Sequence, residues 1–292
     1  MRNGQMQSSL WRNIGTTLEM IKIEHSVFAL PFALLGALLA ARGWPTGWQI
    51  FWIVVAMIGA RSAAMSFNRL IDRDLDARNP RTAQRALPAG LLSARFVTGF
   101  ALVSCAVMVF AAYQLNPLAF RLSPVALAIL FAYSYTKRFT LLSHLVLGFC
   151  LGIAPAAAWI AIRGTLSPSI LLLTAAVTLW TAGFDILYAC QDVDFDRAHG
   201  LRSIPARFGV GAAIRLSRLM HVATIVAMAA LWRGAELPRL YLGGVAIVAA
   251  LLAYEQSLVS ERDLSQVRKA FDLNGYVGII YFGATALSLV IG

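Results

Sequence analysis

Long apolar runs are the feature that most limits what this chain can fold into. A helix needs about 20 mostly apolar residues to cross the hydrocarbon core of a bilayer, and nine runs approach that length. They lie near residues 22–42, 48–70, 95–114, 118–136, 141–162, 167–190, 212–233, 238–258 and 269–290. Only 13% of the 292 residues are charged, against roughly 25% in soluble domains. We therefore predict an all-α, multi-pass membrane protein with about nine transmembrane helices, forming a single domain over residues 1–292.

The basic residues indicate which connectors face the cytoplasm. With a cytoplasmic N-terminus, 19 of the 25 Lys and Arg residues fall in or beside cytoplasmic segments, five fall on the opposite side, and Arg61 lies within the second run. This asymmetry follows the positive-inside rule. It predicts that the two long, charged connectors, 72–94 and 191–211, both lie on the cytoplasmic side. Arginines spread over loops suit an anionic lipid leaflet and anionic substrates better than nucleic acid, so no nucleic-acid partner is expected.

Two D-x-D-x-D segments stand at the ends of the second and sixth runs. They occupy residues 72–76 and 192–196, 120 residues apart, and hold six of the 14 acidic residues. Each is followed by a basic–hydroxyl pair, Arg81-Thr82 or Arg202-Ser203, and then by a proline and a glycine. This register predicts an internal pseudo-repeat of two Asp-rich halves, 68–85 and 185–202. Membrane proteins often place a site between such halves.

The spacing of the acidic residues predicts which of them act together. On a helix, positions four residues apart share a face. Asn68, Asp72 and Asp76 follow that spacing, and Asp185, Asp192 and Asp196, spaced by seven and four residues, also share one face. Asp74 and Asp194 would point elsewhere and are expected to be solvated. Opposed carboxylates suit Mg²⁺, which keeps water and phosphate oxygens among its ligands, so Asp72, Asp76, Asp192 and Asp196 are predicted to bind metal. The alternative is that these acids only cap helices or pair with nearby arginines.

Cations and aromatic rings beside the acidic segments suggest the ligand. The basic residues expected to contact a diphosphate are Arg81, Arg85, Lys137, Arg138 and Arg202. A diphosphate in a membrane cavity belongs either to a lipid substrate that is cleaved or to a diphosphate-driven pump. If an allylic diphosphate leaves with Mg²⁺ and cations, a carbocation remains, and an aromatic face stabilises it. Tyr188, one turn from Asp185, is the aromatic residue predicted to take that role.

These motifs resemble those of the UbiA superfamily of intramembrane prenyltransferases. The matching segments are Asn68-x-x-x-Asp72-x-x-x-Asp76 with Leu87-Pro88-Ala89-Gly90, Tyr133-Ser134-Tyr135-Thr136-Lys137-Arg138, and Asp185-x-x-Tyr188-x-x-x-Asp192-x-x-x-Asp196. The resemblance implies nine helices around a central cavity, Mg²⁺ as cofactor, and transfer of a prenyl chain from polyprenyl diphosphate to an acceptor that is often aromatic. It also implies that Asn68, with the matching Lys and Arg residues, binds diphosphate, as the matching aspartates bind metal.

Within the superfamily the chain is most similar to the 4-hydroxybenzoate polyprenyltransferases of quinone biosynthesis, with one departure in the first run. Glu24-His25-Ser26 stands where those enzymes carry a basic residue followed by proline. Glu24, His25 and Asp185 are therefore the predicted acceptor-binding residues, and the acceptor itself stays open. The same variant resembles a subgroup associated with the futalosine route to menaquinone, which would prenylate a larger aromatic intermediate.

A transporter is the alternative from another functional class, because repeated halves and acidic residues within the membrane fit one. The acids here are predicted at the cytoplasmic ends of the second and sixth runs, whereas a transporter is expected to place charges near the bilayer midplane. The resemblance favours an enzyme of a bacterial cytoplasmic membrane, with membrane lipid around it and the active site facing the cytoplasm. Oligomeric state and prenyl chain length are not predicted.

Overall fold

A computed structural model describes residues 15–22 and 28–291, and within these residues the protein is helical. Eight helices are long and apolar enough to cross a membrane. They are built on α3 (Gly47–Ile71), α5 (Ala94–Leu115), α6 (Pro117–Thr136), α7 (Ser143–Arg163), α8 (Pro168–Ala189), α11 (Val210–Gly234), α12 (Leu240–Ser257) and α13 (Val267–Ile291). The prediction of an all-α membrane protein is confirmed.

The first expected span, 22–42, differs from what the structure describes. The helix there is α2 (Leu30–Ala41), only 12 residues long. Pro31 in its first turn suits a helix start, since the missing N–H would have no partner there. Residues 23–27, which include Glu24 and His25, lie outside the described part of the chain. The described residues thus hold eight helices of spanning length and this shorter one, and the predicted count of nine spans is not confirmed.

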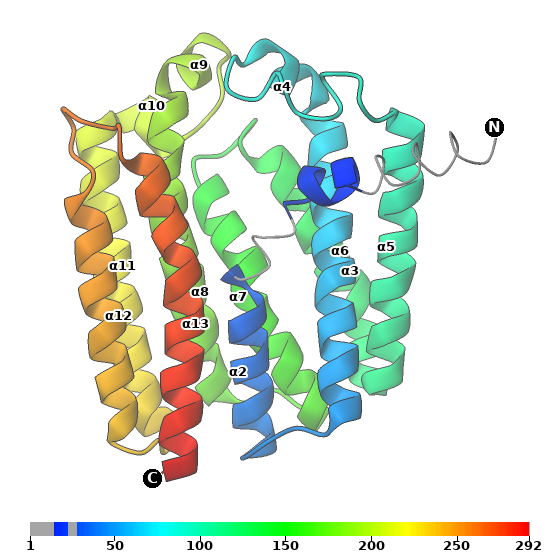
Figure 1. The fold of residues 1–292 in the computed structure, drawn as a ribbon, viewed down its shortest axis with the longest axis vertical. Helices are drawn as coiled ribbons and strands as arrows, with labels where there is room; N and C mark the ends of the chain where they lie inside the picture. Colours follow the sequence, from blue (N-terminus) through cyan, green and yellow to red (C-terminus); the bar gives the residue numbers. More distant parts are fainter. Residues whose placement is uncertain (1–14, 23–27, 292) are drawn as a thin grey trace.

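The helices pack around a central space. Contacts run in sequence from α3 through α5, α6, α7, α8, α11 and α12 to α13, and α2 contacts α13, α7 and α3. Figure 1 shows α11, α12 and α13 on one side of the molecule and α3 and α5 on the other, with α2 and α7 between them. The short helices α4 (Arg73–Arg78), α9 (Val193–Ala198) and α10 (Ile204–Phe208) lie together at one end. The two Asp-rich segments therefore lie at the same end of the molecule.

The largest apolar core lies between α2, α8 and the three C-terminal helices. It is built around large, fully buried side chains that include Phe32, Trp180, Tyr241 and Tyr281. Another contact brings backbones together instead of large side chains, because Gly148 and Gly152 of α7 face the backbone of α8 around Thr178. Small residues at such positions let membrane helices approach closely. The wall formed by α7 and α8 is thus tightly packed, and it borders the central space.

Candidate functional site

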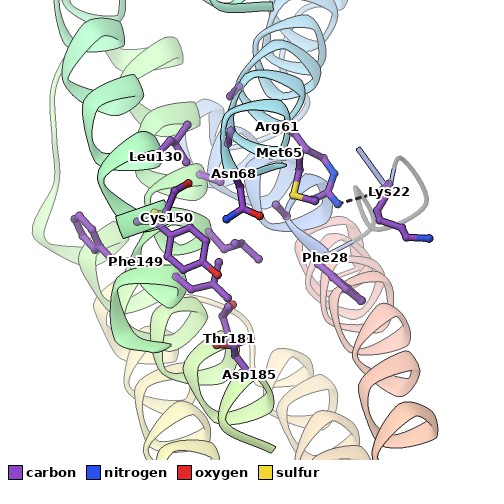
Figure 2. A pocket seen from close by; sticks show the side chains of 18 of the residues that line it. Lys22, Phe28, Arg61, Met65, Asn68, Leu130, Phe149, Cys150, Thr181 and Asp185 are labelled. Carbon is purple, nitrogen blue, oxygen red and sulfur yellow. Dashed lines mark hydrogen bonds between the residues drawn. The ribbon is translucent and has the colours of Figure 1, made fainter. Parts of the chain in front are cut away.

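A cavity of about 1150 Å³ opens between α2, α3, α6, α7 and α8. On α3 its lining residues run from Ile53 to Asp72, which is about 28 Å along a helix. Most of this length is apolar, and the charged residues gather where α3 and α8 end, in and beside the Asp-rich segments. Figure 2 shows Asn68 and Met65 of α3 on the same cavity as Thr181 and Asp185 of α8. The shape suits a ligand with a long apolar tail and a charged head.

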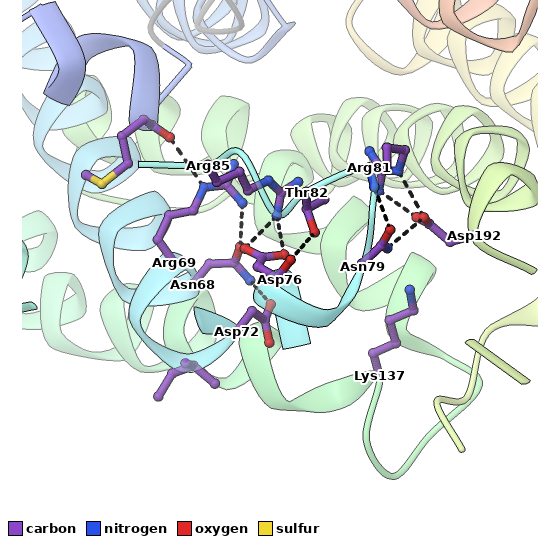
Figure 3. A network of polar contacts seen from close by, with 12 residues as sticks. Asn68, Arg69, Asp72, Asp76, Asn79, Arg81, Thr82, Arg85, Lys137 and Asp192 are labelled. Atoms are coloured by element: carbon purple, nitrogen blue, oxygen red, sulfur yellow. Dashed lines mark hydrogen bonds and ion pairs between the residues drawn. The ribbon is translucent and has the colours of Figure 1, made fainter. Parts of the chain in front are cut away.

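The first acidic segment follows directly from the end of α3. Asp72 is the C-cap of α3, its Oδ2 accepts a hydrogen bond from Asn68 Nδ2 at 2.8 Å, and its Oδ1 lies 3.0 Å from an Arg138 nitrogen. Burial raises the pKa of Asp72 above its usual value, although the hydrogen bond from Arg138 opposes that shift. One turn further, in α4, the buried Asp76 accepts from Arg85 at 2.7 and 2.8 Å. Figure 3 shows the contacts of Asn68 with Asp72 and of Arg85 with Asp76 side by side.

The second segment continues α8 through the 3₁₀ turn η2 (Cys190–Asp192) into α9. Asp192 accepts both branches of the Arg81 guanidinium, at 2.9 and 2.6 Å, and Asn79 Nδ2 at 3.1 Å. Asp196 is fully buried, its Oδ1 lies 2.8 Å from Lys137 Nζ, and its Oδ2 has no hydrogen-bond partner among the described residues. Arg81 and Asn79 belong to the first half of the chain and Asp192 to the second, so the two acidic segments form one site.

The exposure of the acidic side chains agrees with the one-face argument. Asp76, Asp192 and Asp196 are buried, whereas Asp74 and Asp194 are exposed to solvent. Each of the four predicted metal ligands has a basic partner, and those partners are four of the five basic residues predicted to bind diphosphate.

Three other predicted residues have different surroundings. Arg202 is exposed and does not line the cavity; its guanidinium donates to the carbonyl of Phe139 and its backbone N–H to that of Lys137. Tyr188 lines the cavity, where its hydroxyl is 3.2 Å from Arg81 and its ring packs on Phe271. Asp185 also lines the cavity, but its partner is His144.

Sequence reasoning missed several polar residues that line the cavity, Asn79, His144 and Arg69 among them. Asn79 bridges the two halves by donating to Asp192 and accepting from the backbone N–H of Arg81. His144 lies at the start of α7, where a single histidine carries no motif. Arg69 is buried in α3 and donates to Asn68 Oδ1. Asn79 could have been noticed three residues after Asp76, at helical spacing; the other two have no such signal.

The donor set fits Mg²⁺ shared with a phosphate. No group of three or more His, Cys, Asp or Glu side chains is placed to hold a metal ion in the part of the chain that the structure describes. The carboxylates instead stand apart, and the unpartnered oxygen of Asp196 is buried. Mg²⁺ is commonly bound by one or two carboxylates together with substrate phosphates and water. Mg²⁺ bound in this way takes only one or two ligands from the protein, so separate carboxylates like those found here are sufficient.

Comparisons with known proteins agree with this geometry. A sequence profile of the UbiA prenyltransferase family matches residues 29–280. The 4-hydroxybenzoate octaprenyltransferase of Vibrio cholerae serotype O1 is 34% identical over 229 residues, covering 78% of this chain and 80% of that protein. The enzyme of the same name from Photobacterium profundum is 32% identical over 81% of this chain and 82% of its own length.

Solved structures show the same fold. A UbiA homolog from Aeropyrum pernix K1 superposes with a TM-score of 0.83 at 37% identity, covering 91% of this chain and 98% of its own. A UbiA homolog from Archaeoglobus fulgidus bound to DMAPP and Mg²⁺ superposes with a TM-score of 0.73 at 17% identity, covering 95% of this chain and all of its own.

Proposed function

This chain belongs to the UbiA prenyltransferase family, and we propose that it transfers a polyprenyl chain from polyprenyl diphosphate to an aromatic acceptor, with 4-hydroxybenzoate as the favoured acceptor. The observation that carries the proposal is the group of four carboxylates and four cations at one end of a long apolar cavity. A diphosphate head and an apolar tail fit these two regions.

The carboxylates and cations at this end of the cavity would bind the prenyl diphosphate donor, and we call them the donor site. They have complementary tasks. Asp72, Asp76, Asp192 and Asp196 would hold Mg²⁺, which when bound would neutralise charge on the leaving diphosphate. Their partners Arg81, Arg85, Lys137 and Arg138 are placed to contact the diphosphate oxygens, arginine through paired hydrogen bonds and lysine as a point charge. The homolog from Archaeoglobus fulgidus is bound to DMAPP and Mg²⁺, the same class of ligands.

The allylic carbon would ionise beside an aromatic wall. Tyr188 and Phe271 pack with ring centroids 4.6 Å apart, and both line the cavity. Aromatic faces stabilise a neighbouring cation. Arg81 holds the Tyr188 hydroxyl at 3.2 Å and Asp192 at the same time, so the ring is fixed next to the donor site. We assign Tyr188 to stabilising the prenyl cation.

For the acceptor, the named relatives support 4-hydroxybenzoate. Its carboxylate needs a cation away from the diphosphate, and Arg61 offers one on the cavity wall, three turns before Asp72 on α3. Its guanidinium also donates to the carbonyl of Lys22 at 2.8 Å. Glu24 and His25 lie outside the described residues and stay predicted acceptor-binding residues, and Asp185 would face the acceptor from α8.

The surroundings of the enzyme complete the proposal. Eight apolar helices make it an integral membrane protein, and its named relatives are bacterial. We place it in the cytoplasmic membrane with the Asp-rich end facing the cytoplasm, as the distribution of basic residues predicts. A polyprenyl chain could then lie among lipid while the diphosphate stays near water.

A donor–acceptor assay in membranes tests the function. Membranes containing the protein are supplied with Mg²⁺, one labelled polyprenyl diphosphate and a series of aromatic acceptors, with membranes of the Asp76→Ala variant as control. We expect diphosphate release coupled to a ring-prenylated product, abolished by chelating the metal. Preference for a bulkier aromatic acceptor would instead favour the futalosine-derived intermediate. Uptake of a substrate without diphosphate release would contradict the proposal and favour a transporter.

A further inference from the structure

We propose that a second, smaller cavity between the two Asp-rich segments receives the diphosphate when it leaves the donor site, and passes it to water. The inference rests on the proposed function, because it names the exit route of that reaction's leaving group. A prenylated ring is largely apolar and can remain in the membrane. The diphosphate carries several negative charges, which are costly beside hydrocarbon. It therefore needs a polar path of its own.

The second cavity has a volume of about 350 Å³, the share of liquid taken by roughly a dozen water molecules. It is lined by the end of α3, by α4, by the turn that follows α6, and by the loop between α9 and α10. Both halves of the chain thus contribute to it, as they do to the donor site. Its position beside the site makes it a candidate path for what the site releases.

The two cavities share a wall. Leu75, Arg138 and Leu201 line both of them. Of these three, only Arg138 has a polar side chain, and it donates to Asp72 Oδ1 at 3.0 Å and to the carbonyl of Ile71 at 2.7 Å. About 40% of its side chain is nevertheless exposed. A guanidinium has five N–H donors, so Arg138 can contact a phosphate oxygen on either side of the wall.

Two basic side chains stand beyond this wall. Arg78, in the last turn of α4, and His199 line the second cavity and not the first. The His199 ring stacks on Phe195 at 4.0 Å between centroids, and its Nδ1 lies 2.9 Å from the Phe195 carbonyl oxygen. Because a carbonyl oxygen only accepts, the ring hydrogen sits on Nδ1. Nε2 can then accept from a protonated phosphate oxygen, or donate to an ionised one after binding a proton itself.

Hydrogen bonds fix the loop that forms one side of the second cavity. The N–H of Leu201 donates to the carbonyl of Asp196 at 2.9 Å. Arg202 donates from its backbone N–H to the carbonyl of Lys137 at 2.8 Å, and from its guanidinium to that of Phe139 at 2.7 Å. These bonds attach the loop after α9 to the turn after α6. Arg202, which does not line the first cavity, thus belongs to the frame of the second.

One acidic side chain, the exposed Asp74, also lines the second cavity. Its charge opposes that of a bound anion, and exposed ion pairs are weak in any case. Diphosphate should therefore be held only loosely between Arg78 and His199. Loose binding suits a place that a product passes through, since tight binding would delay its departure.

Blocking the second cavity tests the route. In a background with alanine at Cys105, Cys150 and Cys190, Asp74→Cys is modified with a bulky, uncharged methanethiosulfonate that dithiothreitol removes. Ser265→Cys is the control, because Ser265 is exposed between α12 and α13 and lines neither cavity. Membranes receive Mg²⁺, 4-hydroxybenzoate and polyprenyl diphosphate labelled in its diphosphate. Rapid filtration separates label retained with the membranes from label released.

The modified Asp74→Cys enzyme should complete its first turnover at the unmodified rate and retain the labelled diphosphate. Later turnovers should then be slower by about tenfold, because release would limit the rate. Dithiothreitol should restore both release and turnover, and the modified Ser265→Cys enzyme should behave like the unmodified one. Unchanged release from the blocked enzyme would overturn the inference, and so would a first turnover slowed as much as later ones.

Removing the receiving cations gives a second measurement, which also serves if Asp74→Cys fails to insert. Arg78→Gln and His199→Gln should slow release of labelled diphosphate by about two- to fivefold, the range that exposed charge pairs reach. The inhibition constant of inorganic diphosphate against the donor should stay unchanged, because a path changes rates and not the equilibrium at the donor site. Arg73→Gln, an exposed arginine of α4 that lines neither cavity, is the control.

The remaining outcomes separate this inference from the proposed function. Release from Arg78→Gln and His199→Gln as fast as from Arg73→Gln would show that diphosphate leaves by another path. Weaker inhibition by inorganic diphosphate in these two variants would place them in the donor site itself and also contradict the inference. Absence of ring-prenylated product from the unmodified enzyme would instead refute the proposed function.

Discussion

At the scale of single residues, the acidic segments show how two neighbouring aspartates acquire different roles. Asp74 and Asp76 are two positions apart, yet one is exposed and the other is buried against Arg85. The difference follows from helical geometry, since residues two apart point to different faces. Their chemical type is the same, so they form matched pairs for testing what the buried face does.

Alanine at Asp72, Asp76, Asp192 or Asp196 should lower prenyl transfer by on the order of 10²-fold or more, because each variant loses a charged oxygen that acts on the leaving group. Asp74→Asn and Asp194→Asn should keep most of the activity. The comparison is made by initial rates in membranes, with insertion checked by detergent extraction. Equal losses in the two sets would contradict the assignment of one functional face.

The exposure of Asp74 and Asp194 could be predicted from the spacing of the aspartates, but the partners of the other aspartates could not. Asn79 and Arg81 contact Asp192 more than 100 residues away, and His144 meets Asp185 from another helix. Such contacts depend on tertiary packing, which local periodicity does not record. Arg202 was predicted to contact the diphosphate because it follows the second acidic segment in the sequence. Its guanidinium instead donates a hydrogen bond to the carbonyl of Phe139.

At the scale of helices, the packing of α7 on α8 holds Asp185 and His144 in register. Gly148 and Gly152 bring the backbones of these helices together, and at Gly152 only the small Thr178 side chain lies between them. The apolar runs predicted both helices to within a few residues, because a bilayer sets a minimum length for each span. The first run was less predictable, because apolar composition does not mark where α2 begins.

Gly148→Ala should destabilise the folded protein by about 1–3 kcal/mol, as extra atoms do in a packed core. An added Cβ would meet the backbone carbonyl oxygen of Thr178. Gly99→Ala is the control, because its Cβ would meet nothing within 4 Å, and alanine there favours the helix. Thermal unfolding in detergent, followed by loss of the folded-protein peak in size-exclusion chromatography, measures both. Equal stability of the two variants would show that the α7–α8 contact can relax.

At the scale of the whole molecule, one site is assembled from the two halves of the chain. α4 and α9 lie at the same end in Figure 1. Arg81, which follows α4, forms a salt bridge with Asp192, which directly precedes α9. The shared end was predicted from the distribution of basic residues together with an alternating path through the membrane. Which helices would surround the cavity could not be predicted from the residues, because its walls come from helices distant in sequence.

Cysteine labelling tests the orientation of this end. In a background without Cys105, Cys150 and Cys190, single cysteines at the exposed positions Ala77 and His199 should react with a membrane-impermeant maleimide only from the cytoplasmic side. A cysteine replacing Trp44, in the connector at the other end of α3, should react only from the opposite side. Labelling of Ala77→Cys and His199→Cys from different sides would refute a shared site.

The salt bridge between Arg81 and Asp192 also has an evolutionary consequence. Two segments more than 100 residues apart in the sequence depend on each other for their polar contacts. A substitution on one side changes what the other side tolerates, and contacting residues show this as non-additive effects. Residues at the contacting positions of the two segments should therefore change together during evolution. A library that varies positions 79, 81 and 192 jointly should therefore yield active combinations whose single replacements are inactive on their own.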